Sequence, residues 1–168
     1  IIQHGEIVSF DTDMVGPYGY CADISRTFVC GNDFNNNQKE LYSISLDQIN
    51  HNSNLIKAEM SFREFIEKSW KLPEEYYGNR YSVMVHGIGL CDEWPSIRYP
   101  TDGGDKSGRF LKNMTITVES YIGKVGGKEG VKLEQQYLVG ENGLELMSHH
   151  PLDCLLYTSP SPRDDELS

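Results

Sequence analysis

The strongest constraint on this chain is a group of acidic residues inside segments that otherwise have the apolar character of β-strands. They lie in three motifs: FDTD followed by CADISRTF, then VHGIGL, then VES followed by KLEQ. One carboxylate buried alone is costly, whereas several carboxylates around a cation neutralise the cation and one another. The motifs therefore predict a divalent-metal site. Its candidate ligands are Asp11, Asp13, Asp23, His86, Glu119 and Glu134.

The chemistry of this set limits the kind of ion. Five carboxylates and one imidazole offer mostly oxygen donors, which suit hard or borderline divalent ions better than a thiolate-type zinc site does. The five carboxylates carry a charge of −5, which nearly balances the +4 of two divalent ions. We expect one or two ions as cofactors, and the set is compatible with Fe, Mn, Zn or Co.

The local sequence patterns predict where these ligands lie. Alternating apolar and polar residues predict a strand over 6–12 and a second strand over 21–30, joined by a Gly-Pro-Tyr-Gly turn. A hairpin of the two would bring Asp23 opposite Asp11 and Asp13. On an extended chain, two positions two apart point their side chains to the same side.

The rest of the chain alternates between helical and strand patterns. A helix is expected over 38–57, and a second begins at the capping-box pattern Ser61-Phe-Arg-Glu and ends at Pro73. The further predicted strands span residues 81–90, 115–120, 131–139 and 144–147. Each candidate ligand thus lies on or beside a strand, which gives a metal site rigid support.

Composition excludes several classes of protein. A chain of 168 residues is one domain or part of one. Its net charge of −10 argues against a nucleic-acid partner, and the lack of a long apolar run argues against a membrane span. The four cysteines show no disulfide-framework spacing, so we expect reduced thiols in a cytoplasmic protein.

Both ends of the sequence invite an interpretation. The chain opens on Ile1 just before a strand, so we expect an N-terminally truncated domain over 1–153. Residues 154–164 match the translation of a common sequencing-library adapter, which predicts a non-native tail over 154–168. The alternative is a disordered tail rich in serine and proline.

In order, the motifs resemble the creatinase/methionine aminopeptidase superfamily (peptidase M24), whose members present acidic residues and one histidine on a curved sheet. Here Asp23, His86, Glu119 and Glu134 occupy the matching positions. The resemblance implies an α+β pita-bread fold, a curved antiparallel sheet flanked by helices, of which this chain would be part of the C-terminal catalytic domain. It also implies a homodimer for the whole protein.

Within this superfamily the phrases around the motifs are similar to the dimethylsulfoniopropionate (DMSP) lyase branch, the DddP type. This resemblance implies a metal-dependent lyase that forms dimethyl sulfide and acrylate by α-proton abstraction and β-elimination. It assigns Asp11 and Asp13 to the metal, Asp92 as general base and Tyr81 as a residue that holds substrate. Tyr81, Trp94 or Tyr99 would hold the sulfonium by cation–π contact.

Several alternatives remain open from the sequence. A metallopeptidase of the Xaa-Pro aminopeptidase or prolidase type would share the ligands, but such enzymes carry a second histidine soon after HGIGL. No histidine lies between His86 and His149 here. A non-catalytic binding module on the same fold is a third possibility. Whatever the function, the alternative for Asp92 is a surface carboxylate beside Glu93, and the alternative for Tyr81 and Trp94 is a hydrophobic wall.

Overall fold

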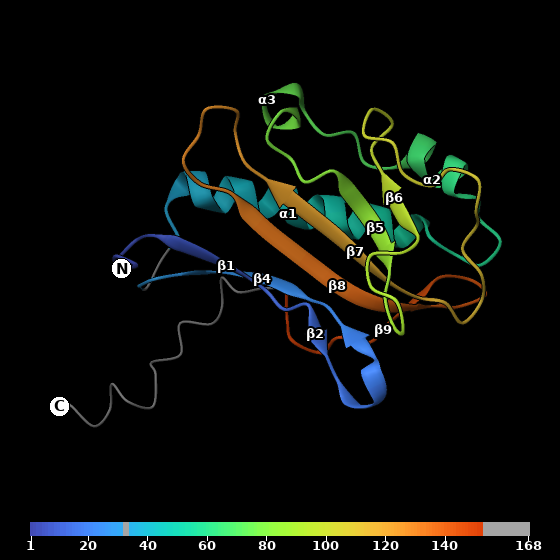
Figure 1. Ribbon diagram of the computed structural model, residues 1–168. Helices are drawn as coiled ribbons and strands as arrows, with labels where there is room; N and C mark the ends of the chain where they lie inside the picture. The colour runs from blue at the N-terminus through green and yellow to red at the C-terminus, as the bar shows by residue number, and fades with distance from the viewer. Residues whose placement is uncertain (32–33, 153–168) are drawn as a thin grey trace.

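A five-stranded antiparallel sheet forms the centre of the computed structural model, which describes residues 1–31 and 34–152 (Figure 1). The strand order is β6-β5-β7-β8-β9. In that order the strands span Ser96–Arg98, Val83–Gly87, Thr115–Ile122, Val131–Val139 and Leu144–Leu146. The predicted tail over 154–168 lies outside the described residues.

The long helix α1, Asn36–Leu55, lies across one face of β7 and β8 (Figure 1). It begins at Asn35, whose side chain accepts from the Gln38 N–H while the Gln38 side chain accepts from the Asn35 N–H. This reciprocal pair satisfies two N–H groups that a helix start would otherwise leave free. The helix therefore begins two residues earlier than the sequence pattern predicts.

Two short helices complete the covering of the sheet. Helix α2, Phe62–Lys68, begins after Ser61, whose hydroxyl accepts from the Glu64 N–H as the sequence predicts. It ends before the expected Pro73, because the Trp70 N–H donates to Asn52 Oδ1 on α1. Helix α3 spans Glu74–Tyr77.

Aliphatic and aromatic side chains fill the space between these helices and the sheet. Fully buried members include Leu41, Tyr42, Ile49, Phe65, Tyr76, Phe110, Ile116, Val118 and Leu133. Among the described residues no helix is both long enough and apolar enough to cross a membrane.

The N-terminal segment forms two small hairpins on the other side of β8 (Figure 1). Strands β1, Ile7–Asp11, and β4, Ser25–Val29, pair antiparallel with Asp11 opposite Ser25. Strands β2, Met14–Val15, and β3, Cys21–Ala22, form a second hairpin around the 3₁₀ turn Pro17–Gly19.

The single strand predicted over 21–30 is therefore wrong, because it breaks at Asp23 and Ile24. The break has a visible cause in side-chain hydrogen bonds. The Asp23 N–H donates to Gln136 Oε1 at 3.3 Å, and the Ile24 N–H donates to Thr12 Oγ1 at 3.0 Å. Side-chain acceptors replace the strand ladder there.

Candidate metal centre

The register of the central sheet brings the candidate ligands onto one face. Glu119 on β7 lies directly opposite Glu134 on β8, and His86 on β5 lies opposite Thr117, two residues before Glu119. The intervening Val118 points into the core. Because side chains alternate along a strand, the ligand face is the one turned away from α1.

Two opposed glutamates in the interior need a reason. Like charges directly opposite each other in a sheet are destabilising, and Glu119 and Glu134 are 1% and 0% exposed. The Oε1 atoms of both are buried and accept no hydrogen bond from any described residue. Two buried carboxylate oxygens on one face, neither satisfied by a hydrogen bond from the described residues, fit a cation.

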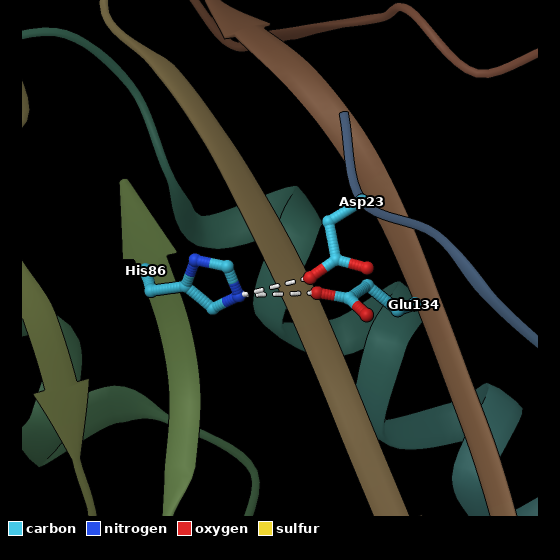
Figure 2. A group of neighbouring side chains, drawn as sticks. All are labelled: Asp23, His86 and Glu134. Atoms are coloured by element: carbon cyan, nitrogen blue, oxygen red, sulfur yellow. Dashed lines mark ion pairs between the residues drawn. The ribbon is translucent and has the colours of Figure 1, made fainter. Parts of the chain in front are cut away.

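The His86 imidazole points toward the same two carboxylate oxygens. Its Nε2 lies 3.2 Å from Glu134 Oε1, 3.8 Å from Asp23 Oδ2 and 3.8 Å from Glu119 Oε1. Figure 2 shows His86 on β5, Asp23 in the segment before β4 and Glu134 on β8 converging on one point. One ligand atom from each of these three buried residues lies within 4.8 Å of the others, so the group could hold a metal ion.

A second group shares one of these residues. Asp11, Asp13 and Asp23 also bring one oxygen each within 4.8 Å of one another, and the first two are exposed. The sequence predicts an extended chain at Asp13, but the structure shows a φ of +33° there. Aspartate tolerates this conformation better than most residues do. The Asp13 N–H donates to Asp23 Oδ1 at 3.3 Å, and this turn keeps the aspartates together.

The crowded acids perturb one another's protonation. Burial raises the pKa of Asp23 to about 7, with further contributions from the charges of Glu134 and Asp11. Burial likewise raises the pKa of Glu119 to about 8, although Lys132 opposes the rise. Burial lowers the pKa of His86, but Glu134 and Glu119 outweigh it and raise that pKa to about 10. The site therefore retains protons that a divalent ion would displace.

Two residues that the sequence did not single out touch the ligands. The Lys132 ammonium contacts Glu119 Oε2 directly, and it lies 3.6 Å from Asp11 Oδ2 and 3.9 Å from Glu134 Oε2. The Ser25 hydroxyl lies 2.6 Å from Asp11 Oδ1 and 2.8 Å from Glu134 Oε2. The position of Lys132, two before Glu134 on one strand, was the signal that could have revealed it.

A cavity of about 490 Å³ opens beside the candidate ligands. Its lining includes Asp11, Asp13, Asp23, Asn79, Arg80, Tyr81, Glu93, Glu119 and Lys132. The ring of Tyr81 already faces a cation of the chain, because Lys132 Nζ lies 4.6 Å from its centroid. Trp94 is 63% exposed and is not among the lining residues. The structure thus brings Tyr81 to the cavity, but neither Trp94 nor the predicted base Asp92, whose neighbour Glu93 lines it instead.

Asp92 occupies a different side of the imidazole from the ligand carboxylates. Its Oδ1 lies 3.9 Å from His86 Nδ1, the ring nitrogen that does not face the carboxylates, and accepts from the Glu93 N–H at 3.0 Å. His86 Nδ1 is also 3.0 Å from the Gly87 carbonyl oxygen. The Gly87 carbonyl oxygen is therefore the hydrogen-bond partner of His86 Nδ1, and the role of Asp92 as a base stays a prediction.

Comparison with known proteins agrees with this geometry. Residues 1–141 match the profile of metallopeptidase family M24. The chain belongs to this family. Solved M24 structures with similar folds include a prolidase from Pyrococcus horikoshii, 26% identical with a TM-score of 0.73 over 91% of this chain and 43% of that one. An X-Pro aminopeptidase from Thermotoga maritima is 27% identical with a TM-score of 0.70, over 89% and 41%. The predicted pita-bread fold is confirmed.

Curated relatives include lyases as well as uncharacterised peptidases. The chain is 38% identical to dimethylsulfoniopropionate lyase DddP of Roseovarius nubinhibens, and 35% identical to that of Roseobacter denitrificans. Both comparisons cover 93% of this chain but 36% of the relative. The chain therefore spans little more than a third of the length of these relatives.

Within an M24 protein, the donor set fits a divalent ion on its own chemistry. Oxygen donors and one imidazole suit such ions. The orphaned oxygens of Glu119 and Glu134 would gain a partner there. Asp23, His86 and Glu134 would hold one ion, with Glu119 adjacent, and Asp11 and Asp13 would extend the site to a second.

Proposed function

We propose that this protein is a metal-dependent lyase that cleaves DMSP into dimethyl sulfide and acrylate. The observation that carries the proposal is the contrast in similarity. The chain is 35–38% identical to two DMSP lyases, whereas the M24 prolidase and X-Pro aminopeptidase reach 26–27% over similar shares of this chain.

The loop after β5 supports the same reading. It runs Leu90-Cys91-Asp92-Glu93, and no histidine follows His86 before His149. A peptidase stabilises a tetrahedral intermediate at the carbonyl it attacks, and the resemblance assigns that task to a second histidine in this loop. Replacing it with acids disfavours amide hydrolysis and suits a substrate that carries a positive charge.

The chemistry of DMSP matches the polarity of the cavity. DMSP carries a carboxylate at one end and a sulfonium at the other. A bound divalent ion would supply Lewis-acid chemistry that makes the proton α to the carboxylate more acidic. The exposed acid Glu93, which is not a candidate metal ligand, lines the cavity and attracts the sulfonium.

The residues of the chain then perform the elimination. Asp92 takes the α-proton as general base. The electron pair of that C–H bond forms the carbon–carbon double bond as the bond to sulfur breaks. Dimethyl sulfide leaves with the electrons of the C–S bond, and acrylate remains. Water takes the proton from Asp92 afterwards.

A second candidate function is hydrolysis of Xaa-Pro peptides. The fold similarity to the prolidase, with its TM-score of 0.73, favours it, as does the cluster of candidate metal ligands. Assaying the same metal-loaded protein with DMSP and with an Xaa-Pro dipeptide separates the two. Turnover of the dipeptide alone would replace the lyase proposal.

The role of Asp92 is tested by two neighbouring variants. Asp92→Asn should reduce DMSP cleavage by at least about 100-fold, because a base of this kind contributes about 10²–10⁴. Glu93→Gln, which removes the adjacent charge, should retain most of the rate and raise KM. If Asp92→Asn keeps its rate and Glu93→Gln loses it, the base is Glu93.

Two further properties of the whole protein belong to this proposal. We propose that it acts in the cytoplasm, which is supported by the free thiols of Cys21, Cys30 and Cys91. We also propose that it is a homodimer, as the superfamily resemblance implies. Cell fractionation and light scattering of the intact protein test these points.

A further inference from the structure

One lysine lies on the acidic ligand face of the sheet. Lys132 belongs to β8, and its side chain is 11% exposed. A charge so far removed from water needs compensation by opposite charge. Three carboxylates supply it, those of Glu119, Asp11 and Glu134.

The contact with Glu119 distinguishes the two oxygens of that carboxylate. Lys132 donates to Oε2. Oε1 is buried, accepts no hydrogen bond from the described residues, and lies 3.8 Å from His86 Nε2. With one oxygen fixed, the carboxylate cannot rotate freely, and its other oxygen is held toward the ligand atoms of His86 and Glu134.

The position of the ammonium is itself fixed. The Tyr81 ring centroid lies 4.6 Å from Lys132 Nζ, a cation–π distance. The other cation in the cavity lining, Arg80, pairs with Asp102 and so adds no net charge. Within the described cavity lining, Lys132 is therefore the cation whose partners are candidate metal ligands.

The charge of the site then sums to a simple value. Five candidate carboxylate ligands give −5 and Lys132 gives +1, so the sum is −5 + 1 = −4. Two divalent ions carry +4. Without Lys132 the same ligands would leave one negative charge unbalanced beside the buried carboxylates of Asp23, Glu119 and Glu134, which is costly.

We propose that Lys132 is a positioning residue of the metal centre, which holds Oε2 of Glu119 so that Oε1 faces the metal and which brings the ligand charge to −4. This inference rests on the metal centre of the proposed function and is independent of the reaction. It follows that metal affinity depends on both the hydrogen bond and the charge of Lys132.

Three substitutions in the intact protein separate these contributions. Lys132→Arg keeps charge and donor, Lys132→Gln keeps a donor without charge, and Lys132→Met keeps neither. Binding of Co²⁺ alone is measured by titration calorimetry, and the Co²⁺ absorption bands report its coordination. We expect the Kd to rise 10- to 100-fold in Lys132→Met, the range for residues that orient metal ligands. The Kd of Lys132→Gln should lie between that of Lys132→Met and that of the parent. The Kd of Lys132→Arg should lie within about threefold of the parent value.

Lys124→Met is the matched control. Lys124 Nζ lies 3.7 Å from Glu40 Oε2, 3.6 Å from Glu75 Oε2 and 5.9 Å from the Tyr76 ring centroid. It repeats the environment of a lysine between two glutamates and a tyrosine, away from the candidate ligands. This variant should leave the Kd and the Co²⁺ bands unchanged.

The outcomes separate this inference from the proposed function. If the parent binds Co²⁺ but Lys132→Met and Lys132→Gln bind it as tightly or more tightly, with unchanged bands, Lys132 does not position the centre. If Lys132→Met does not fold, the Kd values of Lys132→Gln and Lys132→Arg are compared instead. Equal Kd values for these two variants would then show that Lys132 does not position the centre. If the folded parent binds no Co²⁺, the metal centre itself is refuted.

Discussion

Replacing Asp23 with asparagine should make the metal-free protein more stable and remove its response to metal. Asp23 is 3% exposed, and its neighbours Glu134 and Asp11 are acidic. Burial, with the charges of these neighbours, raises the pKa of Asp23 from 3.8 to about 7. The amide of asparagine has the same shape and no charge to bury.

The size of the effect follows from the pKa. The folded state holds the Asp23 proton more tightly than the unfolded chain does, so metal-free stability falls as pH rises from about 4 to about 7. At 1.36 kcal/mol per pKa unit, the loss above pH 7 is at most about 4 kcal/mol. We expect Asp23→Asn to regain about 2–4 kcal/mol at pH 8 and little at pH 4.

Urea unfolding at both pH values, with a chelator and with added Mn²⁺, measures both parts of this prediction. Added Mn²⁺ should stabilise the parent, because a ligand that binds only the folded state stabilises it. It should have little effect on Asp23→Asn. A variant that is less stable than the parent in chelator at pH 8, yet fully stabilised by Mn²⁺, would refute the assignment of Asp23 as a buried ligand.

Three further predictions follow from the same site. Metal affinity should rise from pH 6 to pH 9 with release of protons, because Asp23 and Glu119 have pKa values of about 7 and about 8; calorimetry in buffers of different ionisation enthalpy counts the protons, and a pH-independent Kd would contradict it. Ser25→Ala removes a hydroxyl between two candidate ligands and should raise the Kd for Mn²⁺ about 10-fold, whereas an unchanged Kd would exclude this role. Gly87→Ala would place a Cβ 2.1 Å from the Trp94 backbone oxygen and should lower the free energy of unfolding in urea by at least about 2 kcal/mol. Gly143→Ala is its control, because a Cβ there would have nothing within 4 Å. Equal stability of the two variants would contradict the packing around Gly87.

The sequence predicted the parts of the centre that depend on local pattern. The strand over 131–139 was placed without error, and the motifs around His86, Glu119 and Glu134 led to residues that the sheet brings together. Strand periodicity fixes which side chains share a face, so a motif on each of three strands was enough to predict a common site.

The remaining features depend on contacts between distant segments. The break at Asp23 arises from hydrogen bonds to Gln136 and Thr12, and no local pattern encodes them. The role of Lys132 depends on how far its side chain reaches between β8, β7 and β1. Trp94 was expected to hold substrate because aromatic rings bind sulfonium ions, but its place depends on the loop after β5, which leaves it outside the cavity lining.

Headspace detection of dimethyl sulfide tests the central claim most directly. The intact, metal-loaded protein is incubated with DMSP beside a chelated sample of the same protein. Our account predicts that dimethyl sulfide is released with one equivalent of acrylate, and that chelation abolishes the release. A folded, metal-loaded protein that releases no dimethyl sulfide would contradict the account.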